Sequence, residues 1–223
     1  MSTLAKRRAA EGAMAFLEGA EVIGVGTGST VMELIEIMKP DSRLYVPSST
    51  ETLRALSRRG FRVMHPSSAG RLDVYVDGAD EVDADLNMIK GRGGALMMEK
   101  LLARYSKLRI FIVDETKLVA RLGEKGPVPI EILPEAIGFV EGKLDDMGLR
   151  FTERTCAGKR GPLMSDTRGY ILDVEVPPEG NPADLDSRLR SIPGVLETGF
   201  FFDLADVVVV GYQDRVRVLT RGR

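Results

Sequence analysis

A short stretch of the sequence, residues 77–100, gathers the side chains best suited to chemistry. It reads DGADEVDADLNMIKGRGGALMMEK, with five carboxylates ahead of a lysine and three glycines. Glycine has no Cβ, so the backbone N–H groups of such a loop can approach and stabilise an anion or an oxyanion. Lys90 adds a positive charge beside the loop, and Glu99 follows as a candidate general base. The stretch therefore predicts an acid–base site for an anionic ligand.

The flanking sequence indicates how this stretch is positioned. Residues 72–76 alternate apolar and polar side chains, which predicts a strand. After Gly94, apolar residues recur at helical spacing through Tyr105. The acidic run thus follows a strand and the glycines precede a helix, at the edge where open α/β sheets bind ligands. Glu99 falls on the border of the helix's apolar stripe, where partial desolvation raises the proton affinity of a carboxylate.

Ordinary structural roles would also explain each residue taken alone. Carboxylates after a strand are commonly solvated loop residues or helix caps, glycine before a helix is commonly a turn, and Glu99 fits a helix flank. The cluster favours a site, because a plain loop has no need for all of these residues within one short span.

The motifs resemble those of a known family. DGADE at residues 77–81, and KGRGGAL at residues 90–96 with Glu99 after it, resemble the ribose-5-phosphate isomerases of the A type. GTGST at residues 26–30 and the D-x-x-K pattern from Asp114 to Lys117 resemble further motifs of that family. The likeness continues through VPIEILPEA and IPGVLETG, so it covers nearly the whole chain.

The resemblance implies interconversion of D-ribose 5-phosphate and D-ribulose 5-phosphate through a cis-enediolate, without cofactor or metal. Glu99 would be the base, Lys90 and the loop N–H groups would stabilise the enediolate, and Asp77 and Asp80 would handle hydroxyl protons and ring opening. Lys6 would approach the substrate phosphate. The implied substrate-binding residues are Thr27, Gly28, Ser29, Thr30, Asp77, Gly78, Ala79, Asp80, Lys90, Gly91, Arg92, Gly93 and Lys117.

The glycine-containing stretch at residues 24–30 does not match two well-known phosphate-binding loops, the dinucleotide fingerprint and the P-loop. Gly24-x-Gly26-x-Gly28 begins like a dinucleotide fingerprint, but Ser29 stands where the last glycine belongs, and no acidic residue ends the next predicted strand. No GKT or GKS follows either, which excludes a P-loop.

Composition narrows the class of protein. The chain has 223 residues, a formal net charge of −2 and a pI of about 5.7, which argues against nucleic-acid binding. One Cys and one His exclude Cys/His zinc sites and make a Ser-His-Asp triad a poor fit. There is no apolar stretch long enough for a signal peptide or a membrane span. We therefore expect a cytoplasmic enzyme without a nucleic-acid or membrane partner, and, on the resemblance, a homodimer or homotetramer.

The fold class follows from the order of predicted elements. Residues 1–124 with 203–223 predict an open, mostly parallel, Rossmann-like sheet flanked by helices. A break in composition at residues 123–129 (GEKGPVP) precedes a β-α-β-β-α-β order, which predicts a smaller ferredoxin-like α+β domain over residues 125–202.

Two other function classes remain open at this point. One is a non-catalytic sugar-phosphate sensor, which would keep the GTGST loop but have no need of Glu99. The other is a Mg²⁺-dependent phosphohydrolase that uses the acidic run as hard-metal ligands: Asp77, Asp80, Glu81, Asp83 and Asp85.

Overall fold

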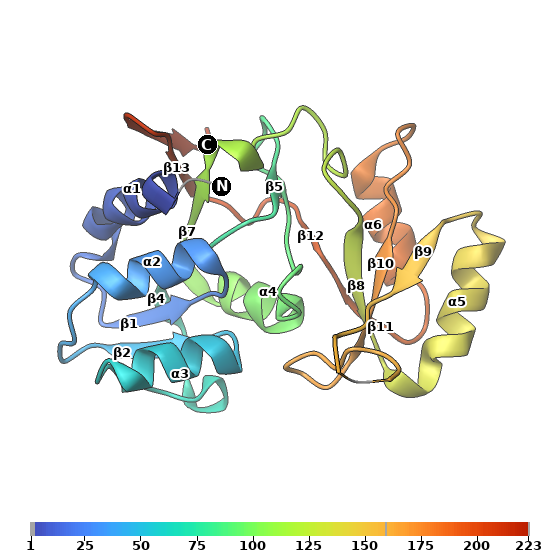
Figure 1. The fold of residues 1–223 in the computed structure, drawn as a ribbon, viewed down its shortest axis with the longest axis horizontal. Helices are drawn as coiled ribbons and strands as arrows, with labels where there is room; N and C mark the ends of the chain where they lie inside the picture. Colours follow the sequence, from blue (N-terminus) through green and yellow to red (C-terminus); the bar gives the residue numbers. More distant parts are fainter. Residues whose placement is uncertain (1–2, 159, 223) are drawn as a thin grey trace. The chain divides into compact units, whose positions relative to one another are not determined.

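The computed structural model describes residues 3–158 and 160–222. The chain forms two compact units (Figure 1). The first comprises Met1–Ala79, Met98–Leu118 and Asp203–Arg223, and the second comprises Asp80–Met97 and Val119–Phe202.

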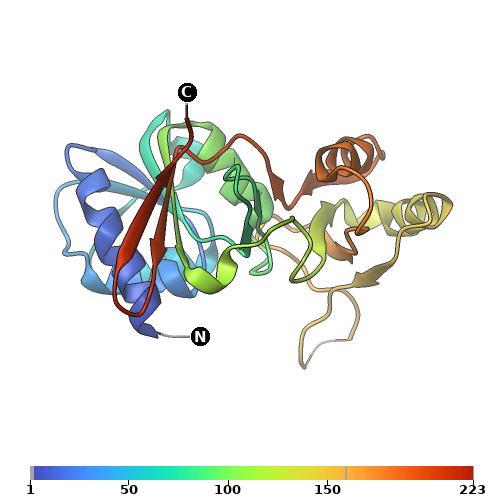
Figure 2. The same cartoon turned by 90° about the horizontal axis from the view of Figure 1, so that it is seen from above.

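The first unit is built on a seven-stranded sheet in the order β14-β13-β7-β4-β1-β2-β3. All neighbouring strands are parallel except β13 and β14, which form an antiparallel hairpin at one edge (Figure 2). The strands are β1 (Val22–Val25), β2 (Leu44–Pro47), β3 (Arg62–Val63), β4 (Leu72–Asp77), β7 (Ser106–Asp114), β13 (Val207–Gly211) and β14 (Val216–Thr220). The Rossmann-like sheet predicted from the sequence is confirmed.

Helices connect these strands. They are α1 (Thr3–Ala13), α2 (Ser29–Ile37), α3 (Thr50–Arg58) and α4 (Leu96–Arg104), with 3₁₀ turns η1 (Met14–Leu17), η2 (Pro66–Ser68) and η3 (Glu115–Lys117). Apolar residues of α1 and α2 share one buried cluster with alternate residues of β1, β4, β7 and β13. The helical segment that begins with α1 changes to 3₁₀ geometry at Met14, and Gly19 (φ +74°) lets the chain turn away after it.

The strand order reverses beside β1. Strands β2 and β3 follow on one side of it, whereas β4 and β7 follow on the other. In such a sheet the loops after the two strands at the reversal point diverge and leave a crevice for a ligand. Val25 of β1 pairs with Val76 of β4, so the GTGST loop and Asp77 begin at the same level of the sheet. The first unit therefore presents two of the predicted motifs side by side.

The second unit holds a four-stranded antiparallel sheet in the order β11-β8-β10-β9. Its elements are β8 (Val128–Ile132), η4 (Pro134–Ala136), α5 (Ile137–Asp146), β9 (Phe151–Glu153), β10 (Tyr170–Val174), α6 (Pro182–Arg190) and β11 (Val195–Thr198). Val128, Ile130 and Ile132 alternate along β8 and join a core cluster with residues of α5 and α6. This strand order and connection are those of the predicted ferredoxin-like arrangement.

A small three-stranded sheet, β12-β6-β5, completes the second unit. It joins β5 (Glu81–Val82) and β6 (Met88–Ile89) to β12 (Phe200–Phe201). From the sequence, residues 80–97 were expected to belong to the domain of the first sheet. In the structure they pack with the second unit, because residues 200–201 pair with β6.

The last strand of the predicted β-α-β-β-α-β order, over residues 194–201, proved to be two. The apolar run at residues 194–201 divides at Gly199 into β11 and β12, which belong to different sheets. Gly199 accepts the Lys90 N–H at 2.9 Å and donates its own N–H to Pro129 O at 2.7 Å. A Cβ at this position would lie 2.4 Å from the Lys90 carbonyl oxygen, so the crossing requires glycine.

Candidate functional site

Asp77 ends β4 and lies at the centre of the first unit's polar cluster. Its side chain is fully buried. Oδ1 accepts the N–H groups of Thr27 (3.0 Å) and Gly78 (2.7 Å), and Oδ2 accepts the Tyr75 hydroxyl (2.5 Å). A Cβ on Gly26 would come within 1.9 Å of this carboxyl group. The first glycine of GTGST is therefore needed for Asp77 to reach the loop.

The Thr27 hydroxyl is used inside the unit. It donates to Ser49 Oγ at 2.6 Å and lies 2.9 Å from Ser48 Oγ, both at the end of β2. Thr52 completes this hydroxyl cluster and donates to Gly26 O at 2.6 Å. Ser49 also caps α3, because its side chain accepts the Thr52 N–H. The cluster fixes the GTGST loop, so Thr27 shapes the loop through its hydroxyl and its N–H.

Tyr75 and Glu99 extend this cluster. Both are buried, Glu99 in the first turn of α4 with 3% of its surface exposed. Burial raises the pKa of the Tyr75 phenol well above its usual range, and the negative charges of Asp77 and Glu99 raise it further. The phenol thus stays protonated and serves as a constant donor to Asp77. Glu99 is the desolvated carboxylate that the sequence predicted.

Tyr75→Phe is expected to destabilise the protein, because it removes a donor from a buried carboxylate. Hydrogen bonds to charged groups contribute about 1.5–3 kcal/mol, which corresponds to a loss of roughly 3–12 °C in Tm for a chain of this size. Thermal denaturation measures the effect. Tyr105→Phe is the matched control, because Tyr105 is 59% exposed. Equal Tm values for the two variants would contradict this role for the hydroxyl.

The first unit also holds the GTGST loop and two lysines, Lys6 and Lys117. Gly28 (φ +114°) leads into α2, whose first residue is Ser29. Lys6 of α1 donates to Ser29 Oγ at 2.8 Å, which brings a lysine more than twenty residues away to the loop. Thr30 is buried beside it. Lys117 lies half-buried at the end of η3, just after β7, with Asp114 capping that turn.

The glycine loop belongs to the second unit and forms a tight turn. Gly94 donates its N–H to Gly91 O at 3.0 Å, and Arg92 donates its N–H to Asp80 Oδ2 at 3.1 Å. Gly91 and Gly94 both have positive φ, +102° and +81°. Of the N–H groups at residues 91–94, those of Arg92 and Gly94 thus have partners in the second unit, and we keep those of Gly91 and Gly93 as the candidate oxyanion donors.

Lys90 and Asp80 flank this turn. Lys90 is 2% exposed, and its Nζ lies 5.5 Å from the centroid of the Phe201 ring. Asp80 is half-buried and donates its own N–H to Ile89 O. Ala79 and Gly78, which the sequence assigned to substrate binding, form the half-buried connection from β4 to Asp80.

The rest of the acidic run has structural partners. Glu81 is fully buried and accepts the N–H groups of Gly123 (2.7 Å) and Lys125 (3.0 Å), and Arg92 Nη2 lies 3.3 Å from it. Asp83 accepts the N–H groups of Asp85 and Asn87. These carboxylates therefore close turns, and Arg92 contributes its side chain to one of them.

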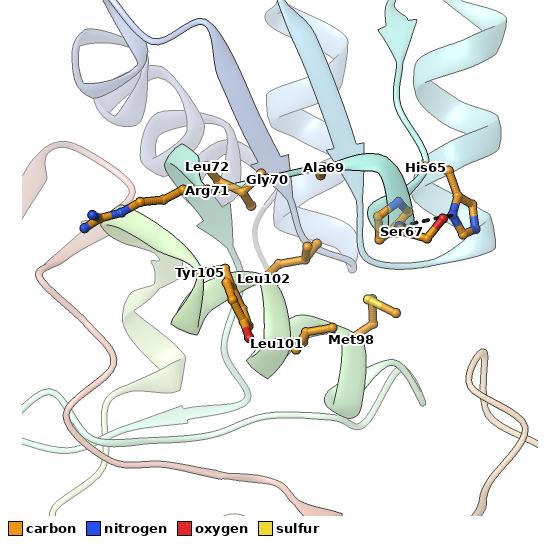
Figure 3. A pocket seen from close by; sticks show the side chains of 11 residues that line it. His65, Ser67, Ala69, Gly70, Arg71, Leu72, Met98, Leu101, Leu102 and Tyr105 are labelled. Atoms are coloured by element: carbon orange, nitrogen blue, oxygen red, sulfur yellow. Dashed lines mark hydrogen bonds between the residues drawn. The ribbon is translucent and has the colours of Figure 1, made fainter.

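A large cavity of the first unit lies apart from these residues. It has a volume of about 660 Å³ and lies between the segment before β4 and the outer face of α4 (Figure 3). Met98, Leu101, Leu102 and Tyr105 line it from the helix, and His65 lies at its rim, where it bonds Ser67 (Figure 3). Neither Asp77 nor Glu99 is among the described residues that line it.

Two features are absent from residues 3–158 and 160–222. No helix there is both long and apolar enough to cross a membrane. No group of three or more His, Cys, Asp or Glu side chains there is arranged to hold a metal ion.

Comparisons with known proteins agree with the residue-level evidence. Residues 44–215 match the family model of ribose 5-phosphate isomerase A (phosphoriboisomerase A). The ribose-5-phosphate isomerase A of Aeropyrum pernix is 47% identical over 85% of this chain and 82% of its own. That of Thermomicrobium roseum is 40% identical over 98% of this chain and 94% of its own.

Solved structures give the same result. A D-ribose-5-phosphate isomerase in complex with phospho-erythronic acid superposes with a TM-score of 0.90 and 37% identity, over 97% of this chain and 98% of that one. The enzyme of Methanocaldococcus jannaschii gives a TM-score of 0.88 at 32% identity, again over 97% and 98% of the two chains. With its DGADE, KGRGGA and GTGST motifs in place, the chain belongs to the ribose 5-phosphate isomerase A family.

Proposed function

We propose that this protein interconverts D-ribose 5-phosphate and D-ribulose 5-phosphate. The observation that carries the proposal is the buried pair of carboxylates, Asp77 and Glu99, beside a GTGST loop at the reversal point of a parallel sheet. Aldose–ketose isomerisation needs one base that removes a proton from C2 and returns it to C1, through an enediolate. Family membership supports the choice of substrate.

Glu99 is the proposed base. It is nearly inaccessible to water, which limits exchange of the transferred proton with solvent. Asp77 and Asp80 are proposed to move the hydroxyl protons during ring opening. Asp77 is held rigidly by its three donors for that task, whereas Asp80 accepts the loop N–H of Arg92.

The enediolate requires stabilisation of a developing oxyanion. We propose Lys90 and the N–H groups of Gly91 and Gly93 for this role, in agreement with the family motif. Lys90 has a fixed main chain, because its N–H donates to Gly199 O at 2.9 Å. A charge held on a rigid segment costs little reorganisation during the reaction.

The phosphate is proposed to bind at the GTGST loop. Gly28, Ser29 and Thr30 offer N–H groups and hydroxyls at the N-terminus of α2, and Lys6 already contacts Ser29. Lys117 is proposed as a second cation for the substrate. Thr27 is proposed to support the loop from behind through its hydroxyl cluster.

We further propose that the chain works as a homodimer or homotetramer in the cytoplasm, where its charged substrates are retained. Phe139 is 79% exposed and Leu133 is 45% exposed beside a groove of about 490 Å³ in the second unit. Self-association is one way to cover such an apolar surface. Sedimentation velocity tests the assembly.

An isomerisation assay on ribose 5-phosphate tests the function, and it should give full activity after exhaustive chelation with EDTA. The enediolate mechanism uses a lysine and N–H groups, and Glu81 and Asp83 already accept backbone N–H groups of their own unit. Ribose 5-phosphate binding without turnover would indicate a sensor. Activity lost in EDTA and restored by Mg²⁺, with release of inorganic phosphate, would indicate a phosphohydrolase.

A further inference from the structure

The glycine loop of the second unit is held by an arginine about sixty residues away in the sequence. Arg154 follows β9, and its Nη1 donates to the carbonyl oxygens of Gly91 (2.8 Å) and Arg92 (3.1 Å). Its side chain is only 13% exposed. One guanidinium nitrogen thus contacts two successive peptide groups of the loop.

Asp173 fixes the orientation of that guanidinium. Its carboxylate accepts Arg154 Nε at 2.8 Å and also accepts Nη2, so the two side chains form a bidentate pair. The strands beneath them are paired, because β9 is antiparallel to β10 and Arg154 N–H donates to Ile171 O at 2.9 Å. A bidentate pair on a paired sheet leaves the arginine little freedom.

The contacts determine which way the loop's N–H groups face. In a planar trans peptide, the C=O of one residue and the N–H of the next point in opposite directions. Gly91 C=O faces Arg154, so Arg92 N–H faces away from it and meets Asp80. Arg92 C=O also faces Arg154, so Gly93 N–H faces away as well. Gly93 is exposed, which leaves that N–H accessible to a ligand.

We propose that Arg154, held by Asp173, is a positioning residue that sets the glycine loop in its oxyanion-binding orientation. This rests on the isomerase function proposed above. The guanidinium charge also polarises the two carbonyls it contacts, which strengthens their peptide N–H groups as donors. Neither Arg154 nor Asp173 belongs to the motifs that identify the family.

The test uses Arg154→Met, which keeps the length of the side chain and removes its donors. We expect kcat to fall about 10–100-fold with KM within about threefold, because a misplaced donor acts on the transition state. Arg154→Lys should recover part of the loss, since an ammonium donates but does not reproduce the planar fork. Arg150→Met is the matched control, because Arg150 pairs with Glu175 on the surface, 84% exposed.

Two inhibitors separate positioning from general destabilisation. Phospho-erythronic acid carries a carboxylate in place of the two enediolate oxygens, whereas ribitol 5-phosphate carries the same phosphate and no oxyanion. Arg154→Met should raise Ki about tenfold or more for the first and leave Ki for the second within about twofold. Asp173→Asn should shift the same ratio in the same direction.

Three results would overturn the proposal: wild-type kcat in folded Arg154→Met, an equal rise in both Ki values, or the same losses in Arg150→Met. If Arg154→Met does not fold, the Ki ratios of Arg154→Lys and Asp173→Asn decide the matter. Failure of the isomerase function is distinguishable, because wild-type protein would then show no turnover in the same assay.

Discussion

Glu99→Gln should abolish isomerisation while leaving substrate binding nearly intact. Glutamine keeps the shape of the side chain but cannot take a proton. A general base contributes about 10²–10⁴-fold to the rate, and the loss is larger where no other group can replace it. Steady-state kcat and the Ki of a non-isomerising sugar phosphate measure the two effects separately.

The burial of Glu99 is the reason to expect a loss at the upper end of that range. A residue with 3% of its surface exposed leaves little room for water to act as a substitute base. Asp77, the other buried carboxylate of the cluster, already accepts hydrogen bonds from two N–H groups and a phenol. These donors hold its carboxylate at the end of β4, where its proposed task is the transfer of hydroxyl protons and not of the proton on C1 and C2.

Glu51→Gln provides the control for this prediction. Glu51 lies in the first turn of α3, as Glu99 lies in the first turn of α4, and both helices have nine residues. Glu51 is exposed, so the same substitution should leave kcat unchanged. If Glu99→Gln retained more than about a tenth of wild-type kcat, the base would have to be another residue.

Much of this site was predictable because its residues cluster in the sequence. Asp77 stands directly after an alternating strand and Glu99 stands on the edge of a helix stripe, so local periodicity alone indicated where each would lie. Tyr75 was missed, although a usable signal was present. Residues two apart on a strand share a face, and that rule places the Tyr75 hydroxyl beside Asp77.

Contacts between segments far apart in the sequence could not be predicted from local periodicity. Lys6 reaches Ser29 from another helix, and Arg154 reaches Gly91 from another strand. Their separations of 23 and 63 residues exceed what helical or strand periodicity can relate. The hydroxyl cluster around Thr27 likewise depends on β1 and β2 being neighbours, which is a property of the sheet order.

The sequence was sufficient to predict the two large sheets of the fold, but not the small three-stranded sheet. Long apolar runs such as β7 and the β-α-β-β-α-β order were sufficient for the two sheets. The two-residue strands β5 and β6 were not predicted, and β12 was not separated from β11, since two residues carry no periodicity. Their pairing is what brings residues 80–97 into the second unit, and Gly199 is the local feature that permits it.

The phosphate should be required for efficient turnover. We expect free ribose to have kcat/KM lower than ribose 5-phosphate by at least about 10³-fold. Each charge-assisted hydrogen bond to a phosphate contributes about 1.5–3 kcal/mol, and the GTGST loop with its lysines offers several. These contacts are remote from C1 and C2, so part of their energy should appear in kcat as positioning. Efficient turnover of free ribose would remove the loop from the site.

Replacing Lys117 tests the predicted phosphate contact at a single residue. Lys117→Ala should raise the Ki of ribitol 5-phosphate by roughly 10–150-fold, the factor that corresponds to one charge-assisted contact. Lys107→Ala is the matched control, because Lys107 lies near the opposite end of β7 and pairs with Asp73 at 2.7 Å. Both variants lose one positive charge, so the change in the protein's net charge is the same in each. A Ki that changes only in Lys117→Ala therefore reports direct contact with the substrate, whereas equal Ki values would exclude Lys117 from the site.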